Sequence, residues 1–150
     1  MKRKNAINPL QLTYRYVDAV EHDFEACGPC YVSIELQISN MIQNSQKKIC
    51  CYLQTRSTED ENVVWVGKTK QFVEDLDSNE IRTVTLKAAI MQPGVYDINK
   101  FYVSIVKGHH QDASETPQGM AKVHEIRLPD QLLFTATSST AKAAPPQQLI

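Results

Sequence analysis

Apolar and polar residues alternate along much of this chain. In the segment 31–40, Val32, Ile34, Leu36 and Ile38 share one phase, and polar residues occupy most of the other. Successive side chains of a strand point to opposite faces, so this pattern predicts a strand with one buried and one wet face. Alternation or short β-branched runs predict further strands over 10–17, 49–55, 63–66, 71–76, 82–90, 94–106, 122–128 and 132–136.

Turn-forming residues separate these segments, at Gly28-Pro29, Asn44-Ser45, 59–62, 77–79 and Pro93-Gly94. Short strands divided by frequent turns are typical of antiparallel sandwiches and barrels. The last two segments supply a final strand or two. The pattern predicts an all-β, antiparallel sandwich of about seven to eight strands.

Two local features qualify this picture. The apolar phase of the segment 94–106 shifts by one residue near Asn99-Lys100, which predicts a bulge within one long strand. Residues 17–25 predict a turn of helix, and the polar segment 107–120 a long mobile loop. We expect residues 1–136 to form a single domain, and the small, polar, proline-containing residues 137–150 to form a disordered tail.

Composition excludes several classes of protein. The 150 residues carry 16 basic and 17 acidic side chains, which gives a net charge of −1. A dedicated nucleic-acid-binding protein normally carries a basic stripe, so no nucleic-acid partner is expected. The N-terminal segment lacks the apolar stretch of a secretory signal, and no apolar run is long enough to span a bilayer. We therefore expect a cytoplasmic protein with reduced cysteines.

The sequence Cys27-Gly28-Pro29-Cys30 matches the redox tetrapeptide of thioredoxin-like proteins. In those proteins the first thiol sits at a helix N-terminus, which favours the nucleophilic thiolate. Here the residues after Cys30 alternate and predict a strand. A thiol oxidoreductase using Cys27 and Cys30 is thus the weaker interpretation, and a turn leading into a strand is the stronger one.

Two other groups contain metal-ligand residue types. Cys27, Cys30, Cys50 and Cys51 offer only half of a zinc pattern, because adjacent residues on a strand point to opposite faces. The pair His109-His110 falls in the polar loop without a fixed ligand spacing. No catalytic, cofactor-binding or metal-binding set is therefore predicted.

A Gly-x-Tyr sequence formed by Gly94, Val95 and Tyr96 opens a predicted strand. In immunoglobulin-like sandwiches this arrangement makes a tyrosine corner, in which the phenol points inward and its hydroxyl bonds a nearby backbone group. Trp65 is the only tryptophan, and its ring could fill space between two sheets. Ile98 stands where an antibody domain has its second cysteine, so packing alone would hold the sheets together. Trp65, Gly94 and Tyr96 are the expected structural residues.

The stretch from Cys30 to Val106 resembles the C-terminal immunoglobulin-like domains of the large subunits of TRAPP, the transport protein particle complexes. The residues that carry the resemblance are Trp65, Gly67, Leu86, Gly94, Val95, Tyr96, Asp97 and Ile98. Those subunits are many times longer than this chain. The resemblance implies a role in tethering and Rab activation on the early secretory and autophagic pathways, with no catalytic residues to carry over.

Three functional hypotheses follow. The first is a non-catalytic scaffold domain of a TRAPP assembly, whose partners are other subunits, a Rab GTPase indirectly, and Golgi or endoplasmic reticulum membranes peripherally. The second is the thiol oxidoreductase, and the third is an adaptor similar to vesicle-coat appendage domains that captures short peptides. Tyr31 and Tyr52 are candidate interface residues because tyrosine is enriched in interfaces, although single exposed aromatic residues are normal.

Overall fold

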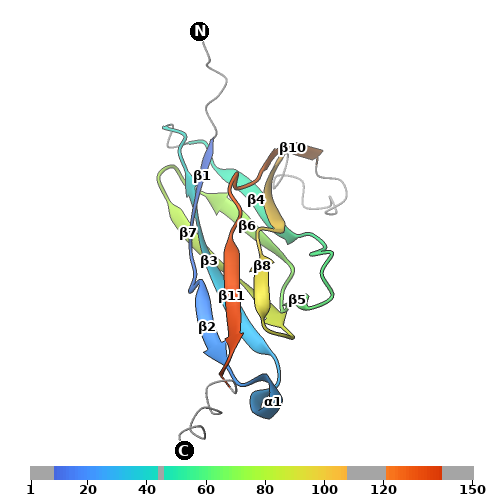
Figure 1. Ribbon diagram of the computed structural model, residues 1–150. Helices are drawn as coiled ribbons and strands as arrows, with labels where there is room; N and C mark the ends of the chain where they lie inside the picture. Colours follow the sequence, from blue (N-terminus) through green and yellow to red (C-terminus); the bar gives the residue numbers. More distant parts are fainter. Residues whose placement is uncertain (1–8, 44–45, 108–120, 140–150) are drawn as a thin grey trace, which may run out of the picture.

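The computed structural model describes residues 9–43, 46–107 and 121–139. These residues form eleven strands and one short helix (Figure 1). Their bounds are β1 (Leu10–Arg15), β2 (Ala19–His22), α1 (Phe24–Cys27), β3 (Cys30–Asn40), β4 (Ile49–Thr55), β5 (Val63–Val66), β6 (Lys70–Leu76), β7 (Ile81–Ile90), β8 (Gly94–Asp97), β9 (Phe101–Lys107), β10 (Ala121–Ile126) and β11 (Leu133–Ser138).

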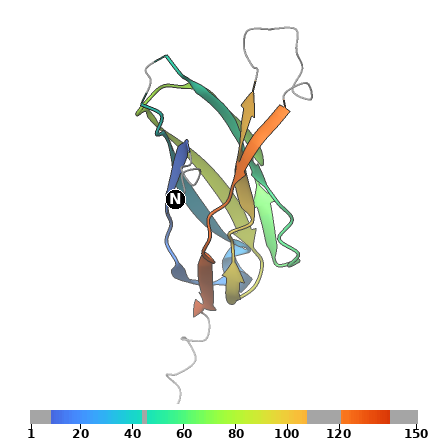
Figure 2. The same ribbon diagram turned by 90° about the horizontal axis from the view of Figure 1, so that it is seen from above.

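The strands form three sheets that make up the two layers of a sandwich (Figures 1 and 2). The first sheet has the order β1-β3-β7-β5, the second β10-β9-β4-β6, and the third β2-β11-β8. The third sheet continues the second, since β8 leads into β9 and β10 into β11. The backbone N–H of Ile98 donates to Leu132 O at 2.8 Å across the junction between them.

All strand pairs are antiparallel except β2 with β11, which is parallel. The longest ladder joins β3 to β7, from Cys30 opposite Ile90 to Ser39 opposite Ile81. This register places the apolar phases of both strands on the same face. A shift by one residue would turn the buried set to solvent, so the core fixes the pairing.

The core lies between the layers and is built from the alternating positions that the sequence indicates. Val32, Ile34, Leu36 and Ile38 are all buried, and polar residues alternate with them. The phase shift in the segment 94–106 is also present: the buried positions include Tyr96 and Ile98, then Phe101, Val103 and Ile105. The predicted all-β antiparallel sandwich is therefore confirmed.

Two local predictions are wrong. The chain at 94–106 does not form one bulged strand, because β8 ends at Asp97 and β9 begins at Phe101. The Asp97 carboxylate accepts from the backbone N–H of Asn99 at 3.0 Å, an Asx-type turn that breaks the strand. Residues 17–25 do not form one helical turn either, because 19–22 form β2 and the helix is confined to Phe24–Cys27.

The number of strands was underestimated, since the described residues contain eleven rather than seven to eight. The additional strands are β2, which lies in the segment predicted as a helical turn, and those produced by the breaks between β8 and β9 and between β10 and β11. Strand β11 continues through Ser138, two residues past residue 136, where the domain was expected to end. Residues 108–120, with His109 and His110, and residues 140–150 lie outside the described part of the chain.

Candidate functional site: the tyrosine corner, the cysteines and the exposed sheet faces

Tyr96 has the geometry of a tyrosine corner. Its ring is buried, and its hydroxyl donates to Gln92 O at 2.7 Å, with Pro93 O at 3.3 Å. Burial, followed by the nearby Asp60 carboxylate, raises the pKa of Tyr96 above its usual value. The hydroxyl thus closes the connection between β7 and β8 by bonding the backbone four residues before it.

Gly94 is required by this corner for steric reasons. A Cβ atom built on Gly94 would lie 2.8 Å from the Tyr96 hydroxyl oxygen and 3.0 Å from the ring carbon that bears it. Real Cβ contacts essentially never come this close to a neighbouring atom. The glycine of the Gly-x-Tyr sequence therefore leaves space for the tyrosine ring to fold back over the strand.

We predict that Tyr96→Phe lowers the free energy of unfolding by about 1 kcal/mol, the net contribution of one hydrogen bond. The ring stays in place, so only the hydrogen bonding of the hydroxyl to Gln92 O and Pro93 O is lost. Urea denaturation measures the difference, and Tyr14→Phe, at an exposed tyrosine, is the control. An unchanged midpoint for Tyr96→Phe would show that the hydroxyl bond is not a structural lock.

Trp65 connects the two layers. It lies on β5 in the first sheet, and its ring meets Phe101, the first residue of β9 in the second sheet, edge to face with centroids 6.4 Å apart. The indole N–H donates to Arg56 O at 3.0 Å. The ring is half-buried against the core, so it fills space between the sheets with its polar edge satisfied.

The Cys27–Cys30 segment forms a turn. Cys27 is the last residue of α1, so its thiol is not at a helix N-terminus. Gly28 adopts a positive φ of 75°, which glycine tolerates, and β3 starts at Cys30. The carbonyl of Gly28 lies 3.0 Å from His22 Nε2, a contact that holds the turn. The helix that the redox interpretation required after this tetrapeptide is replaced by a strand.

Cys50 and Cys51 point to opposite faces of β4, as predicted. Cys51 is fully buried, and Cys50 is half-buried with its sulfur 3.8 Å from Asp75 Oδ1. Burial raises the pKa of Cys51 to about 12 and also raises the pKa of Cys30. Among residues 9–43, 46–107 and 121–139, no group of three or more His, Cys, Asp or Glu side chains could hold a metal ion.

Thiol reactivity should follow this burial. We expect Cys27, which is exposed, to react first with a thiol reagent at mildly alkaline pH, and Cys50 more slowly. Cys30 and Cys51 should react only on unfolding, because their thiols are buried and their raised pKa values disfavour the thiolate. Mass spectrometry of the alkylated chain identifies the order. Rapid labelling of Cys30 in the native protein would contradict it.

The same pKa shifts predict a loss of stability at alkaline pH. The pKa of Cys51 rises from 9.0 to about 12 on folding, so the fold favours the protonated thiol. Its stabilising contribution is complete below pH 9.0 and is lost as the pH rises from there toward the folded value. Urea denaturation measured across this range should show the decline. In the Cys51→Ala variant, the free energy of unfolding should decline less steeply with pH. Equal slopes for the variant and the wild-type chain would contradict the raised pKa of Cys51.

An aromatic row crosses the outer face of the second sheet. Tyr52 on β4 lies 5.7 Å from Phe72 on β6 and 6.4 Å from Tyr102 on β9, between ring centroids. Lys70 Nζ lies 4.5 Å from the Tyr52 ring centroid, and Arg127 Cζ lies 5.9 Å from that of Tyr102. Of these three rings, only Tyr52 was a candidate interface residue from the sequence. The outward phases of β6 and β9 could have indicated Phe72 and Tyr102, but only the register places the three rings together.

The other candidate interface residue, Tyr31, is on the opposite layer and is 56% exposed. Lys87 Nζ lies 5.5 Å from its ring centroid. Both residues line an open hollow of about 560 Å³ together with Lys68, Gln71 and Thr85, among others. Tyr31 and Tyr52 are thus on different faces of the sandwich and cannot belong to one compact site.

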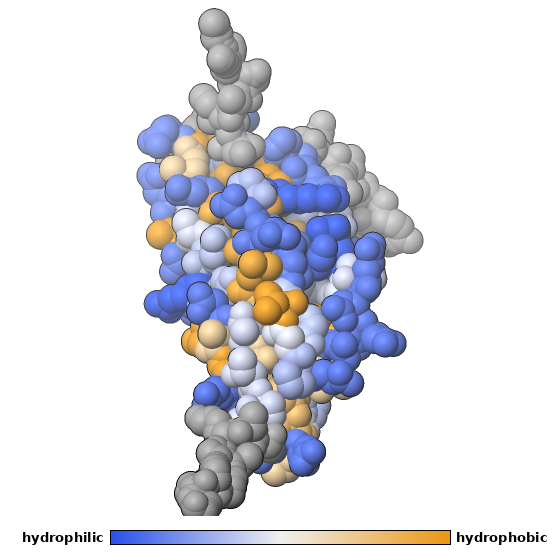
Figure 3. Space-filling model, viewed as in Figure 1, coloured by the Kyte–Doolittle hydropathy of each residue, from blue (hydrophilic) through white to orange (hydrophobic). Residues whose placement is uncertain are grey.

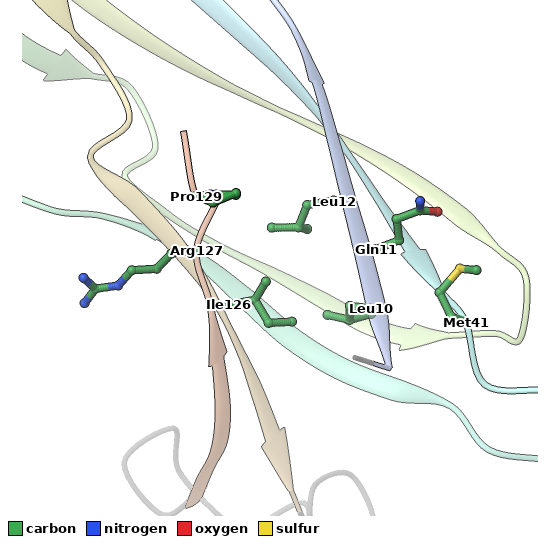
Figure 4. Close-up of a pocket in the computed structure, with 7 residues that line it drawn as sticks. All are labelled: Leu10, Gln11, Leu12, Met41, Ile126, Arg127 and Pro129. Atoms are coloured by element: carbon green, nitrogen blue, oxygen red, sulfur yellow. The ribbon is translucent and has the colours of Figure 1, made fainter. Parts of the chain in front are cut away.

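A second hollow of about 520 Å³ opens at the seam between the layers (Figure 4). Leu10 and Leu12 from β1 converge there with Ile126 at the end of β10 and with Pro129, whereas Arg127 points away. Leu10 and Ile126 also belong to the core. The hollow is therefore the place where the core reaches the surface between two sheet edges.

Comparisons with known proteins agree with this architecture. The two-layer sandwich with a tyrosine corner defines an immunoglobulin-like domain. Residues 10–107, from β1 through β9, match the family model of the TPPC8 C-terminal Ig-like domain. The chain belongs to this family, which confirms the predicted relationship to the C-terminal immunoglobulin-like domain of a large TRAPP subunit.

No curated protein matches the chain. A crystal structure of a FixG-related protein from Vibrio parahaemolyticus is similar, with 12% sequence identity and a TM-score of 0.42, over 87% of this chain and 98% of that chain. None of the described residues forms a helix with the length and apolar character needed to cross a membrane.

Proposed function

We propose that this chain is a non-catalytic interaction domain of a TRAPP vesicle-tethering assembly, acting as a scaffold in traffic between the endoplasmic reticulum and Golgi and in autophagy. The observation that carries the proposal is the family match over residues 10–107. Its partners would be other protein subunits, with Rab GTPases engaged indirectly through the assembly. The protein would then be cytoplasmic and associated peripherally with Golgi and endoplasmic reticulum membranes.

The chemistry of the cysteines supports a non-catalytic role. The Cys27–Cys30 segment leads into a strand, and the Cys30 thiol is buried with a raised pKa. Trp65 and Tyr96 pack against the core, and their polar groups donate to the backbone carbonyls of Arg56 and Gln92, which is the bonding of structural residues. Binding through sheet faces or edges is the function that such a domain supports.

A capture experiment tests the proposal. The full chain carrying an affinity tag is expressed in cells, recovered, and its partners identified by mass spectrometry, with the tag alone as control. Recovery of TRAPP subunits is the expected result. Recovery of vesicle-coat and endocytic proteins without TRAPP subunits would contradict the proposal and favour a peptide-binding adaptor.

A further inference from the structure

Apolar side chains gather on the outer face of the third sheet. Val17, Val95 and Leu133 are 66%, 63% and 44% exposed. Thr135 of β11 lies opposite Val95 of β8 on one side and opposite Ala19 of β2 on the other, with Leu133 two residues earlier on the same face. We call Val17, Ala19, Val95, Leu133 and Thr135 the third-sheet patch. Figure 3 looks onto this side and shows apolar side chains grouped near its middle, with hydrophilic side chains above them and to the right.

The patch is held rigidly. Strand β11 is paired on both sides, and Phe134 and Ala136 anchor it from below as fully or almost fully buried core residues. The Tyr16 hydroxyl donates to Leu133 O at 2.8 Å, and the backbone N–H of Thr135 donates to Asp18 O at 2.9 Å. A preorganised surface loses little conformational freedom when a partner binds, so this face meets a basic requirement of a docking site.

The charged side chains within the segments that build the patch are acidic, and the neighbouring Arg15 and Arg127 are ion-paired to Glu35 and Glu125. The three segments that build this face, 16–22, 94–99 and 128–138, contain Asp18, Glu21, Asp97 and Asp130 but no lysine or arginine. Asp18, Glu21 and Asp130 are exposed. An apolar centre with an acidic rim is complementary to an apolar surface rimmed by basic residues.

We infer that the third-sheet patch is the surface through which this domain docks onto another protein chain, one that presents apolar side chains flanked by lysine or arginine. The inference rests on the proposed function and specifies the surface and the partner's chemistry. A second copy of this chain fits poorly, because a symmetric contact would oppose two acidic rims. An anionic membrane fits poorly for the same electrostatic reason.

The first test uses the captured TRAPP subunits. Val95→Ser together with Leu133→Ser should reduce their recovery by about tenfold or more, since central apolar anchors dominate binding. Val64→Ser with Ile81→Ser is the matched control, because these side chains are exposed on the first sheet. Circular dichroism checks that both variants fold. Equal recovery with wild type and the patch variant would overturn the inference and leave the proposed function intact.

The second test addresses charge. Asp18→Lys with Glu21→Lys should weaken recovery of the same subunits, and added salt should weaken recovery with the wild-type chain. Glu59→Lys with Glu61→Lys makes the same change of charge in an exposed loop and is the control. An equal loss for the loop variant would mean that net charge, and not the rim, controls binding, which would contradict the inference.

A third test does not depend on TRAPP and decides the inference if no subunit is recovered. A peptide of alternating lysine and valine is titrated into the isotope-labelled full chain and followed by nuclear magnetic resonance. Saturable shifts should fall on the amides of β2, β8 and β11, and an alternating glutamate and valine peptide should not produce them. Absent shifts, shifts on the other sheets, or stronger binding to phosphatidylserine vesicles would overturn the inference.

Discussion

Phe134→Ala is expected to lower the free energy of unfolding by about 3–5 kcal/mol, the range for deleting a fully buried phenylalanine ring. Phe134 is completely inaccessible to solvent and lies opposite Tyr96 in the pairing of β11 with β8. The loss includes the transfer of the ring and the cavity left beside the tyrosine corner. Because domains of this size have total stabilities of about 5–15 kcal/mol, the variant should be close to unfolding.

The neighbouring residue provides the control. Leu133→Ala changes a side chain of similar apolar character on the same strand, but one that points outward. We expect it to change stability by less than about 0.5 kcal/mol, as for most surface substitutions. Urea denaturation of both variants measures the contrast. Similar losses would mean that β11 does not present one face to the core and the other to solvent.

Gly94→Ala is expected to destabilise the protein by about 1–3 kcal/mol, the usual cost of overpacking. The sign of this stability change is informative, because replacing a strand glycine by alanine normally stabilises a protein when space allows. Here the new Cβ would meet the Tyr96 hydroxyl, which the bond to Gln92 O holds in place. Urea denaturation gives the sign of the change in the free energy of unfolding. A stabilised variant would show that the Tyr96 ring moves aside freely.

Combining Gly94→Ala with Tyr96→Phe separates this steric clash from a general effect of the substitution on the backbone. In a Tyr96→Phe background the closest atom to the new Cβ, the hydroxyl oxygen, is gone. The cost of Gly94→Ala should therefore be smaller there than in the wild-type chain, which is the coupling expected of residues in contact. If the stability losses of Gly94→Ala and Tyr96→Phe were strictly additive, the strain would not arise from the contact between the new Cβ and the Tyr96 hydroxyl.

Local alternation was sufficient to predict most of the strands. In β3, four apolar residues in one phase are all buried, because the core requires one continuous apolar face and the residues that supply it are adjacent in the pattern. The tyrosine corner was also predictable. Its glycine and tyrosine are two residues apart, and its hydrogen bond spans only four, so the interaction is local in sequence.

Pairing between distant segments was not predictable in the same way. Residues 19–22 are a strand because they pair in parallel with β11, more than a hundred residues later. Their isolated pattern, with Val20 and Phe24 one helical turn apart, favoured a helix instead. Likewise, the break at 98–100 depends on the Asp97 carboxylate, which also accepts from the Leu132 N–H at 3.2 Å from the other side of the junction.

The sequence by itself thus determined an antiparallel β-sandwich, its buried phase, its corner and its family, since each depends on periodicity or on residues close together in the chain. Only the tertiary structure decided which exposed residues share a surface. Val17, Val95 and Leu133 come from three separate segments, and none is unusual within its own segment. They form one patch because backbone pairing brings β8, β11 and β2, with the connection that precedes β2, side by side, and that pairing depends on contacts across the whole fold.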